Sequence, residues 1–206
     1  MALTIALTGG IGSGKSTLSR MLVGQGAGLI DTDALARELT APGGAAIDAV
    51  RAQFGGEAIG SDGGLDRPLV RARAFSDARW RRRLEALLHP MIWQRAWQAA
   101  AELAATCAYV VFDVPLLAES GQRDRRFDRV LVIDCPVELQ IERALRRGNL
   151  DRAEVDAIVA AQAGRSQRLA LADDVVFNGT GMAALEARAR RLHALYRDAA
   201  SAHGGV

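Results

Sequence analysis

Short runs of apolar residues recur along the chain, and most of them end at a polar residue. Five such runs cover residues 4–8, 27–30, 109–112, 130–133 and 174–177. They are continuously apolar rather than alternating, which is typical of strands whose sheet is covered by helices on both faces. Stretches with helical spacing separate them. We therefore expect an α/β fold, with a parallel five-stranded sheet flanked by helices.

The polar residues that follow these runs mark one edge of the predicted sheet. They are Asp31, Asp113, Asp134 and Asn178. Open α/β sheets bind ligands at the carboxyl ends of their strands, so these side chains are candidates for a site. Aspartate is also a common helix cap and turn residue. For Asp134, which precedes a helical pattern, we favour the capping and turn interpretation.

A long helical insertion, residues 35–105, separates the second and third strands. Glycines and a proline interrupt it at 41–44 and 55–64, and His89-Pro90 marks a later boundary. The predicted helices cover residues 47–54, 70–88 and 92–105. Such an insert could form a pocket for a second substrate.

Two further helical patterns, 138–147 and 152–162, meet at a turn over Gly148-Asn149. A helical hairpin beside a phosphate site suits a mobile lid. We expect one domain over 1–206, in which the nucleotide-binding core comprises 1–34, 106–137 and 166–206. The insert then covers 35–105 and the lid covers 138–165.

Residues 9–16 read GGIGSGKS, a complete G-x-x-x-x-G-K-[ST] phosphate-binding loop between a strand and a helix. Its glycines allow the backbone to aim N–H groups into one concavity, and the following helix adds its positive dipole end. Lys15, the only lysine of the chain, would reach the β- and γ-phosphates. The Ser16 hydroxyl would bind Mg²⁺. The motif predicts ATP and Mg²⁺ as ligands.

Carboxylates and arginines supply further candidates. Asp31 and Asp33 alternate, so in extended chain both could face a phosphate cleft and orient a hydroxyl. Both could equally be turn residues that cap the next helix, and the two interpretations stay open. Asp113 ends an apolar strand, and we favour a role at the Mg²⁺ hydration shell. Arg143 and Arg147 share a helix face and could neutralise phosphate charge, although many arginine clusters are solvated surface.

Composition narrows the class of protein. The net charge is only +2, and Asp77 and Glu85 flank the basic run 79–83, so we expect no nucleic-acid partner. No apolar run approaches the length of a membrane span. Two cysteines make no disulfide framework. We expect a soluble, cytoplasmic chain that is a monomer or a weak homo-oligomer.

Several motifs, in this order and spacing, resemble the dephospho-coenzyme A kinase family nearly end to end. Beyond the phosphate loop, the matching segments are Ile30-Asp31-Thr32-Asp33, Ala36-Arg37, Phe54-Gly55, Leu65-Asp66-Arg67, Phe75, His89-Pro90-Met91-Ile92, Phe112-Asp113-Val114-Pro115-Leu116-Leu117 with Glu119, Gln140 with Arg143 and Arg147, Ala161-Gln162, and Ala172-Asp173-Asp174-Val175 ending at Asn178. The resemblance departs at Ala118, Gly148 and Phe177, where the family often carries other residues.

The resemblance implies ATP-dependent phosphorylation of the ribose 3′-hydroxyl of dephospho-coenzyme A, the last step of coenzyme A synthesis. It implies that Asp33 is the base, with Lys15 and Arg143 also catalytic. The implied nucleotide contacts are Gly12, Ser13, Gly14, Lys15, Ser16, Thr17, Arg147 and Asn178, and the implied metal positions are Ser16 and Asp113. The implied coenzyme-side positions are Asp31, Arg67, His89, Pro90 and Leu116.

Two other classes share the phosphate loop. Another small-molecule or nucleotide kinase of this fold would have a similar catalytic half and would differ in the insert. A GTP-binding regulatory switch usually reads guanine with an Asn-Lys-x-Asp segment, which a chain whose only lysine is Lys15 cannot contain. We therefore favour the kinase that the family resemblance implies.

Overall fold

The computed structural model describes residues 2–120 and 126–203. The chain divides into two compact units. One unit contains residues 1–30 and 100–206, and the other contains residues 31–99.

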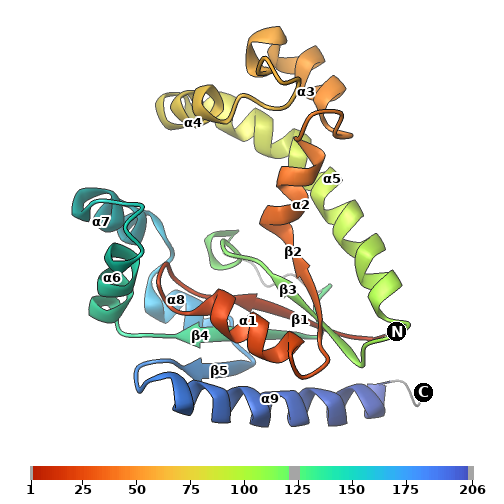
Figure 1. Ribbon diagram of the computed structural model, residues 1–206, viewed down its shortest axis with the longest axis vertical. Helices are drawn as coiled ribbons and strands as arrows, with labels where there is room; N and C mark the ends of the chain where they lie inside the picture. The colour runs from red at the N-terminus through yellow and green to blue at the C-terminus, as the bar shows by residue number, and fades with distance from the viewer. Residues whose placement is uncertain (1, 121–125, 204–206) are drawn as a thin grey trace. The chain divides into compact units, whose positions relative to one another are not determined.

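The first unit is built on a five-stranded sheet with the order β2-β3-β1-β4-β5 (Figure 1). The pairs β1–β3, β1–β4 and β4–β5 are parallel. The predicted parallel five-stranded sheet is therefore confirmed, with strand bounds close to those expected. The strands are β1 (Leu3–Thr8), β2 (Gly28–Asp31), β3 (Tyr109–Asp113), β4 (Arg129–Asp134) and β5 (Asp174–Phe177).

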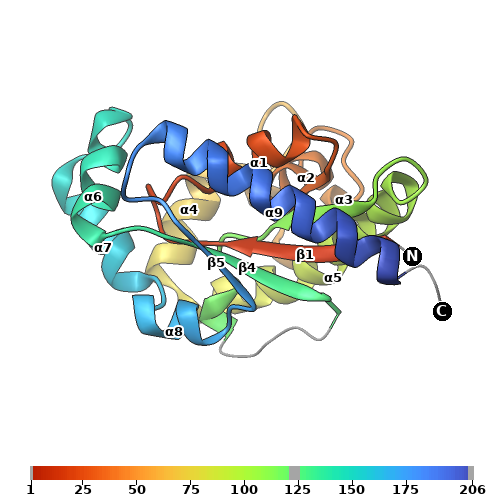
Figure 2. The same ribbon diagram turned by 90° about the horizontal axis from the view of Figure 1, so that it is seen from below.

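Helices α1 (Lys15–Val23) and α9 (Met182–His203) lie side by side on one face of this sheet (Figures 1 and 2). Their Leu22 and Leu185 side chains join a single buried cluster with alternate residues of the strands. On the other face, the Phe112 and Phe127 rings pack edge to face with centroids 5.1 Å apart. Because both faces are buried, the strands have no need of a polar alternation.

The connection from β4 to β5 is helical. It contains α6 (Val137–Arg146), α7 (Arg152–Ala161) and α8 (Arg165–Ala170). Asp151 and Glu154 form a reciprocal capping box that fixes the start of α7. The predicted helical pair is confirmed by α6 and α7, whereas α8 has only six residues and too short a pattern to be predicted.

The second unit consists of helices, and one helix boundary in it differs from the prediction. Its elements are α2 (Thr32–Leu39), α3 (Ile47–Phe54), the short 3₁₀ helix η1 (Gly56–Ala58), α4 (Arg67–Ser76) and residues 78–99 of α5 (Ala78–Leu103). Around Phe54, the Trp80 ring packs edge to face at 4.9 Å between centroids. Val50, Ala58 and Leu84 complete that small core.

The predicted boundary at His89-Pro90 was wrong, because α5 continues through Pro90. The break lies at Asp77, whose carboxylate accepts hydrogen bonds from the N–H groups of Arg79 (2.8 Å) and Trp80 (2.9 Å). This cap starts α5 twelve residues before the proline. Proline removes one backbone hydrogen bond from a helix, a loss that packing on both sides of the position can offset.

A partly buried polar cluster links α9 to the sheet. The Tyr196 hydroxyl donates to Asp174 Oδ2 (2.9 Å), and Arg129 holds the same carboxylate through two hydrogen bonds of 2.7 and 2.9 Å. Burial raises the pKa of the Tyr196 phenol, so this group stays a neutral donor. The cluster joins β4, β5 and α9.

We predict that Tyr196→Phe lowers the free energy of unfolding by about 1 kcal/mol, the usual net value of one hydrogen bond, because the ring stays and only the donor is lost. Chemical denaturation of the purified variant measures this. Leu195→Ala is the control, since Leu195 is 47% exposed and its loss should change the free energy by less than about 0.5 kcal/mol. Equal stability of Tyr196→Phe and the parent chain would contradict the prediction.

Candidate active site

The phosphate loop connects β1 to α1 in a conformation that requires glycine. Gly12 and Gly14 have φ of 69° and 99°, in the left-handed region that side-chain-bearing residues avoid. Gly14 is also the N-cap of α1 and offers no side chain to cover the first turn. The N–H groups at this helix terminus can therefore face an anion.

Neighbouring segments approach the loop so closely that side chains at its glycines would collide with them. A Cβ at Gly12 would overlap the carbonyl of Gln140, and a Cβ at Gly14 would overlap the side-chain amide of Asn178. The Asn178 amide instead donates to the carbonyl oxygen of Ser13 at 2.7 Å. This bond places the predicted nucleotide-side residue Asn178 directly against the loop.

A cavity of about 410 Å³ opens beside the loop, within the size range of small-molecule sites. Predicted nucleotide contacts from three segments of the first unit meet there. The lining residues are Gly12, Gly14, Thr17, Arg143, Arg146, Arg147, Asn178, Gly181, Met182 and Leu185. The lining combines three arginines with the apolar side chains of Met182 and Leu185, which suits a ligand with a phosphate end and an apolar, ring-bearing end.

Arg143 is held in this cavity wall by two contacts. Its Nη1 donates to the carbonyl oxygen of Asn178 at 3.0 Å and lies 3.3 Å from Cys135 Sγ. Burial raises the pKa of the Cys135 thiol, so the sulfur is a neutral neighbour. The guanidinium is thus oriented by its surroundings, and its predicted contact with phosphates stays a prediction.

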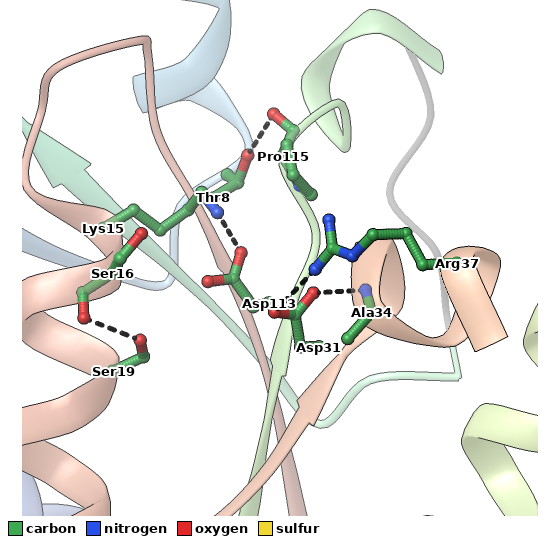
Figure 3. Close-up of polar contacts among 9 residues, drawn as sticks. All are labelled: Thr8, Lys15, Ser16, Ser19, Asp31, Ala34, Arg37, Asp113 and Pro115. Atoms are coloured by element: carbon green, nitrogen blue, oxygen red, sulfur yellow. Dashed lines mark hydrogen bonds and ion pairs between the residues drawn. The ribbon is translucent and has the colours of Figure 1, made fainter. Parts of the chain in front are cut away.

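Lys15 and Asp113 form an ion pair, drawn in Figure 3. Asp113 ends β3 as expected, and both side chains are largely buried, at 15% and 11% exposure. The loop lysine therefore meets the strand-end carboxylate that the sequence assigned to Mg²⁺. A triphosphate that binds Lys15 would compete with this carboxylate for the ammonium.

The donor chemistry near Lys15 fits Mg²⁺. Asp113 and Ser16 supply a carboxylate and a hydroxyl, and Mg²⁺ prefers oxygen ligands, a few from the protein and the rest from water and phosphate. Within residues 2–120 and 126–203, no group of three or more His, Cys, Asp or Glu side chains could form an all-protein metal site. A magnesium ion here would accordingly depend on the phosphates of a bound nucleotide.

Asp134, at the end of β4, does not have the predicted role of a helix cap. It does not cap α6, where Pro136 is the N-cap and makes no side-chain cap. Its carboxylate instead receives two hydrogen bonds from Arg165, Nε to Oδ1 at 2.8 Å and Nη2 to Oδ2 at 2.7 Å. Arg165 holds the pKa of the Asp134 carboxyl below its usual range. The reason is geometric, because α8 brings a guanidinium from 31 residues away.

Asp31, the last residue of β2, and Asp33, two positions later, have different surroundings. Asp31 is the N-cap of α2, accepting from the Ala34 N–H at 2.8 Å, with Arg37 at 3.9 Å (Figure 3). The helix begins at Thr32, so Asp33 lies in its first turn and is exposed. The inference that an extended chain points both carboxylates the same way was therefore wrong.

The remaining predicted substrate positions lie in both units. Arg67 begins α4, and its Nη2 donates to Thr40 Oγ1 at 3.0 Å. Both line a second cavity of about 580 Å³ inside the helical unit, together with Arg37. His89 and Pro90 are exposed on α5, and Leu116, which follows β3, is 60% exposed.

Sequence reasoning missed several residues that shape the site. Met182 and Gly181 line the first cavity at the start of α9, and Arg165 and Arg168 come from the unpredicted α8. Arg168 is almost fully buried, and its desolvation lowers the pKa of the guanidinium. A Gly-x-x-Gln start to α8 was the only local signal for this helix.

A phosphate loop after the first strand of a parallel sheet, beside an arginine-lined cavity, is the arrangement of P-loop nucleotide-binding proteins, a class that includes the P-loop kinases. The fold agrees, since a shikimate kinase from Acinetobacter baumannii superposes with a TM-score of 0.50 at 19% identity, covering 95% of this chain and 93% of its own. A family model described as dephospho-CoA kinase matches residues 3–184. The chain belongs to the dephospho-CoA kinase family.

Individual relatives are similar to this chain over nearly their full length. A dephospho-CoA kinase of Dechloromonas aromatica is 51% identical over 192 residues, 93% of this chain and 92% of the relative. One of Aromatoleum aromaticum is 49% identical and covers 97% of both chains. The solved structure of TT1252 from Thermus thermophilus has a TM-score of 0.80 at 31% identity, covering 94% of this chain and 97% of that one.

Across the described ranges, no helix is both long enough and apolar enough to cross a bilayer.

We predict that Asp134→Asn makes the free energy of unfolding depend less on pH in the acid range. Arg165 lowers the pKa of Asp134 in the folded chain, so the pair stabilises the fold above the ordinary carboxyl pKa of about 3.9. That stabilisation is lost as the pH falls through the lower pKa of the folded state. The free energy of unfolding, measured from about pH 6 to about pH 3, should fall less steeply in the variant.

Asp156→Asn is the control, because Asp156 forms an exposed ion pair with Arg152 one helical turn away. It should keep the slope of the parent chain. A parental slope in Asp134→Asn would show that the Arg165 pair carries no pH-dependent stability.

Proposed function

We propose that this chain transfers the γ-phosphoryl group of ATP to the ribose 3′-hydroxyl of dephospho-coenzyme A, giving coenzyme A and ADP. The observation that supports this most is the complete phosphate loop, with Lys15 paired to Asp113, in a chain that belongs to the dephospho-CoA kinase family over residues 3–184. The reaction is the last step of coenzyme A synthesis.

The nucleotide is assigned to the cavity beside the loop. Residues 12–17 would hold the triphosphate through backbone N–H groups and the Lys15 ammonium, and Arg143 and Arg147 would neutralise its charge. Asn178 and Met182 would lie at the base end. Ser16 and Asp113 would hold Mg²⁺, which would offset the negative charge that develops during phosphoryl transfer.

Asp33 is the proposed base that orients the acceptor hydroxyl and receives its proton. The contacts of Asp31 support this choice between the two candidates. Asp31 Oδ1 is engaged by the Ala34 N–H, and its other oxygen faces Arg37. Asp33 is an exposed side chain in the first turn of α2, able to meet a substrate without removing the cap of that helix.

The helical unit is assigned to the coenzyme. Arg67 lines its cavity with Arg37, and a guanidinium pair suits the diphosphate of dephospho-coenzyme A. Asp31, His89, Pro90 and Leu116 complete the proposed coenzyme side. A cytoplasmic monomer or weak homo-oligomer without a nucleic-acid partner is part of the same proposal.

A phosphate acceptor panel tests the proposal. We expect ADP release from ATP and Mg²⁺ with dephospho-coenzyme A, and background rates with shikimate, AMP or CMP. Lys15→Ala should lower kcat/KM by about 100-fold or more, because it removes a fixed charge at the transferring group. ADP release with only a rival acceptor would overturn the substrate while keeping the kinase class.

Asp33→Asn tests the base separately. We expect kcat to fall by roughly 100-fold or more, with the KM for ATP little changed, since the amide cannot take a proton. Asp48→Asn is the matched control, because Asp48 also lies in the first turn of an insert helix, α3. Normal turnover in Asp33→Asn would remove this residue from the chemistry.

A further inference from the structure

The phosphate loop is contacted from both ends of the α6–α7 hairpin, and each contact comes from a glutamine. Near the start of α6, Gln140 is buried, its Nε2 donates to the Cys135 carbonyl at 2.6 Å, and its own atoms lie against Gly10 and Gly12. Immediately after α7, Gln162 Oε1 accepts the backbone N–H of Ile11 at 2.9 Å. The hairpin therefore enters and leaves beside the loop.

The segment that carries Gln162 is anchored residue by residue. The Ala163 N–H donates to Glu119 Oε1 at 3.0 Å, and its carbonyl accepts from the buried Arg168. The Gly164 N–H donates to Gln167 Oε1 at 2.7 Å. Arg165 follows with its two hydrogen bonds to Asp134. Gln162 therefore contacts the loop from a segment that is itself held in place by hydrogen bonds.

The Ile11 N–H lies in the glycine-rich stretch of the loop. Residues 9–14 contain four glycines, and ordering glycine-rich backbone has a high entropic cost. A hydrogen bond from outside the loop reduces the conformations open to residues 10–12 before any ligand arrives. Less ordering then remains for the phosphates to impose, which favours their binding.

We propose that Gln162 is a positioning residue that holds the phosphate loop in its ligand-receiving shape and couples the loop to the α6–α7 hairpin. The inference rests on the proposed phosphate-binding role of the loop. Because coupling between two ordering events is reciprocal, phosphate binding at the loop also steadies the base of the hairpin. Gln162 does this without touching the reacting atoms.

The chemistry of this bond allows a sharp set of variants. A backbone N–H can only donate, so Gln162 uses its carbonyl oxygen alone. Gln162→Met keeps the length and removes the acceptor, whereas Gln162→Glu keeps the acceptor. Gln167→Met is the matched control, because Gln167 also accepts a backbone N–H in this segment but from Gly164 rather than from the loop.

The first test measures ADP binding by calorimetry in Mg²⁺ and the hydrogen exchange of the Ile11 amide by NMR. In Gln162→Met we expect ADP to bind about fivefold more weakly, the equivalent of one neutral hydrogen bond, and the Ile11 amide to exchange faster. Gln162→Glu should keep the Ile11 protection. Gln167→Met should match the parent chain in both measurements.

Kinetics supply the second readout. The KM for ATP of Gln162→Met should rise by about the same factor, with kcat within about twofold, because the bond acts before chemistry. A lower melting temperature with unchanged ADP affinity and unchanged Ile11 exchange would reduce Gln162 to a structural residue and overturn the proposal.

ADP binding and amide exchange need no phosphate acceptor, so the two proposals fail separately. If Gln162→Met bound ADP more weakly and the parent chain did not turn over dephospho-coenzyme A, only the proposed substrate would be refuted. Turnover of dephospho-coenzyme A with parental ADP affinity in Gln162→Met would refute only the role of Gln162.

Discussion

The site depends on how closely other segments can approach a stretch of bare backbone. Gly10, Gly12 and Gly14 leave room for Gln140 and Asn178, and their conformations turn the chain around a concavity. A methyl group at Gly12 would collide with the backbone of α6, and one at Gly10 or Gly14 would collide with the side-chain amide of Gln140 or Asn178. Because these residues lack side chains, their N–H groups are open to an anion. For the same reason, Gln140 and Asn178 can contact the loop backbone closely.

Around this loop the charges are arranged in partnered sets. Lys15 faces Asp113, Arg165 faces Asp134, and Arg143 donates to the carbonyl of Asn178. Each of these cationic side chains already has an oxygen acceptor within the protein. A ligand with several negative charges would redistribute these contacts rather than meet isolated cations. The charged side chains of the site are therefore already held by partners before a ligand binds.

The sequence predicted the parts of the fold that local patterns determine. The five strands, the phosphate loop and the α6–α7 pair follow from apolar runs, glycine spacing and helical periodicity, and all appear as expected. The helix boundary at Asp77 was missed because Pro90 is the stronger local signal, although it interrupts nothing in α5. A proline predicts a break only where packing does not offset its missing hydrogen bond.

Long-range partners were beyond prediction from one sequence. Asp134 looked like a cap because the helix that follows it is near in sequence, while its actual partner, Arg165, arrives through two intervening helices. Gln162 reaches Ile11 across 151 positions. No spacing rule links such residues. By contrast, the meeting of Lys15 with the end of β3 could be anticipated, since parallel strands bring their carboxyl ends to one edge.

The single lysine has a practical consequence. Twenty-five of the 26 basic Lys and Arg residues are arginines, so one ammonium group, at position 15, is the whole stock of side-chain amines. The Lys15 side chain is 15% exposed, and its amine is paired with the Asp113 carboxylate. Acylating reagents, amine-directed crosslinkers and lysine-modifying enzymes would therefore find, apart from a free α-amino group, only a target that lies in the phosphate loop.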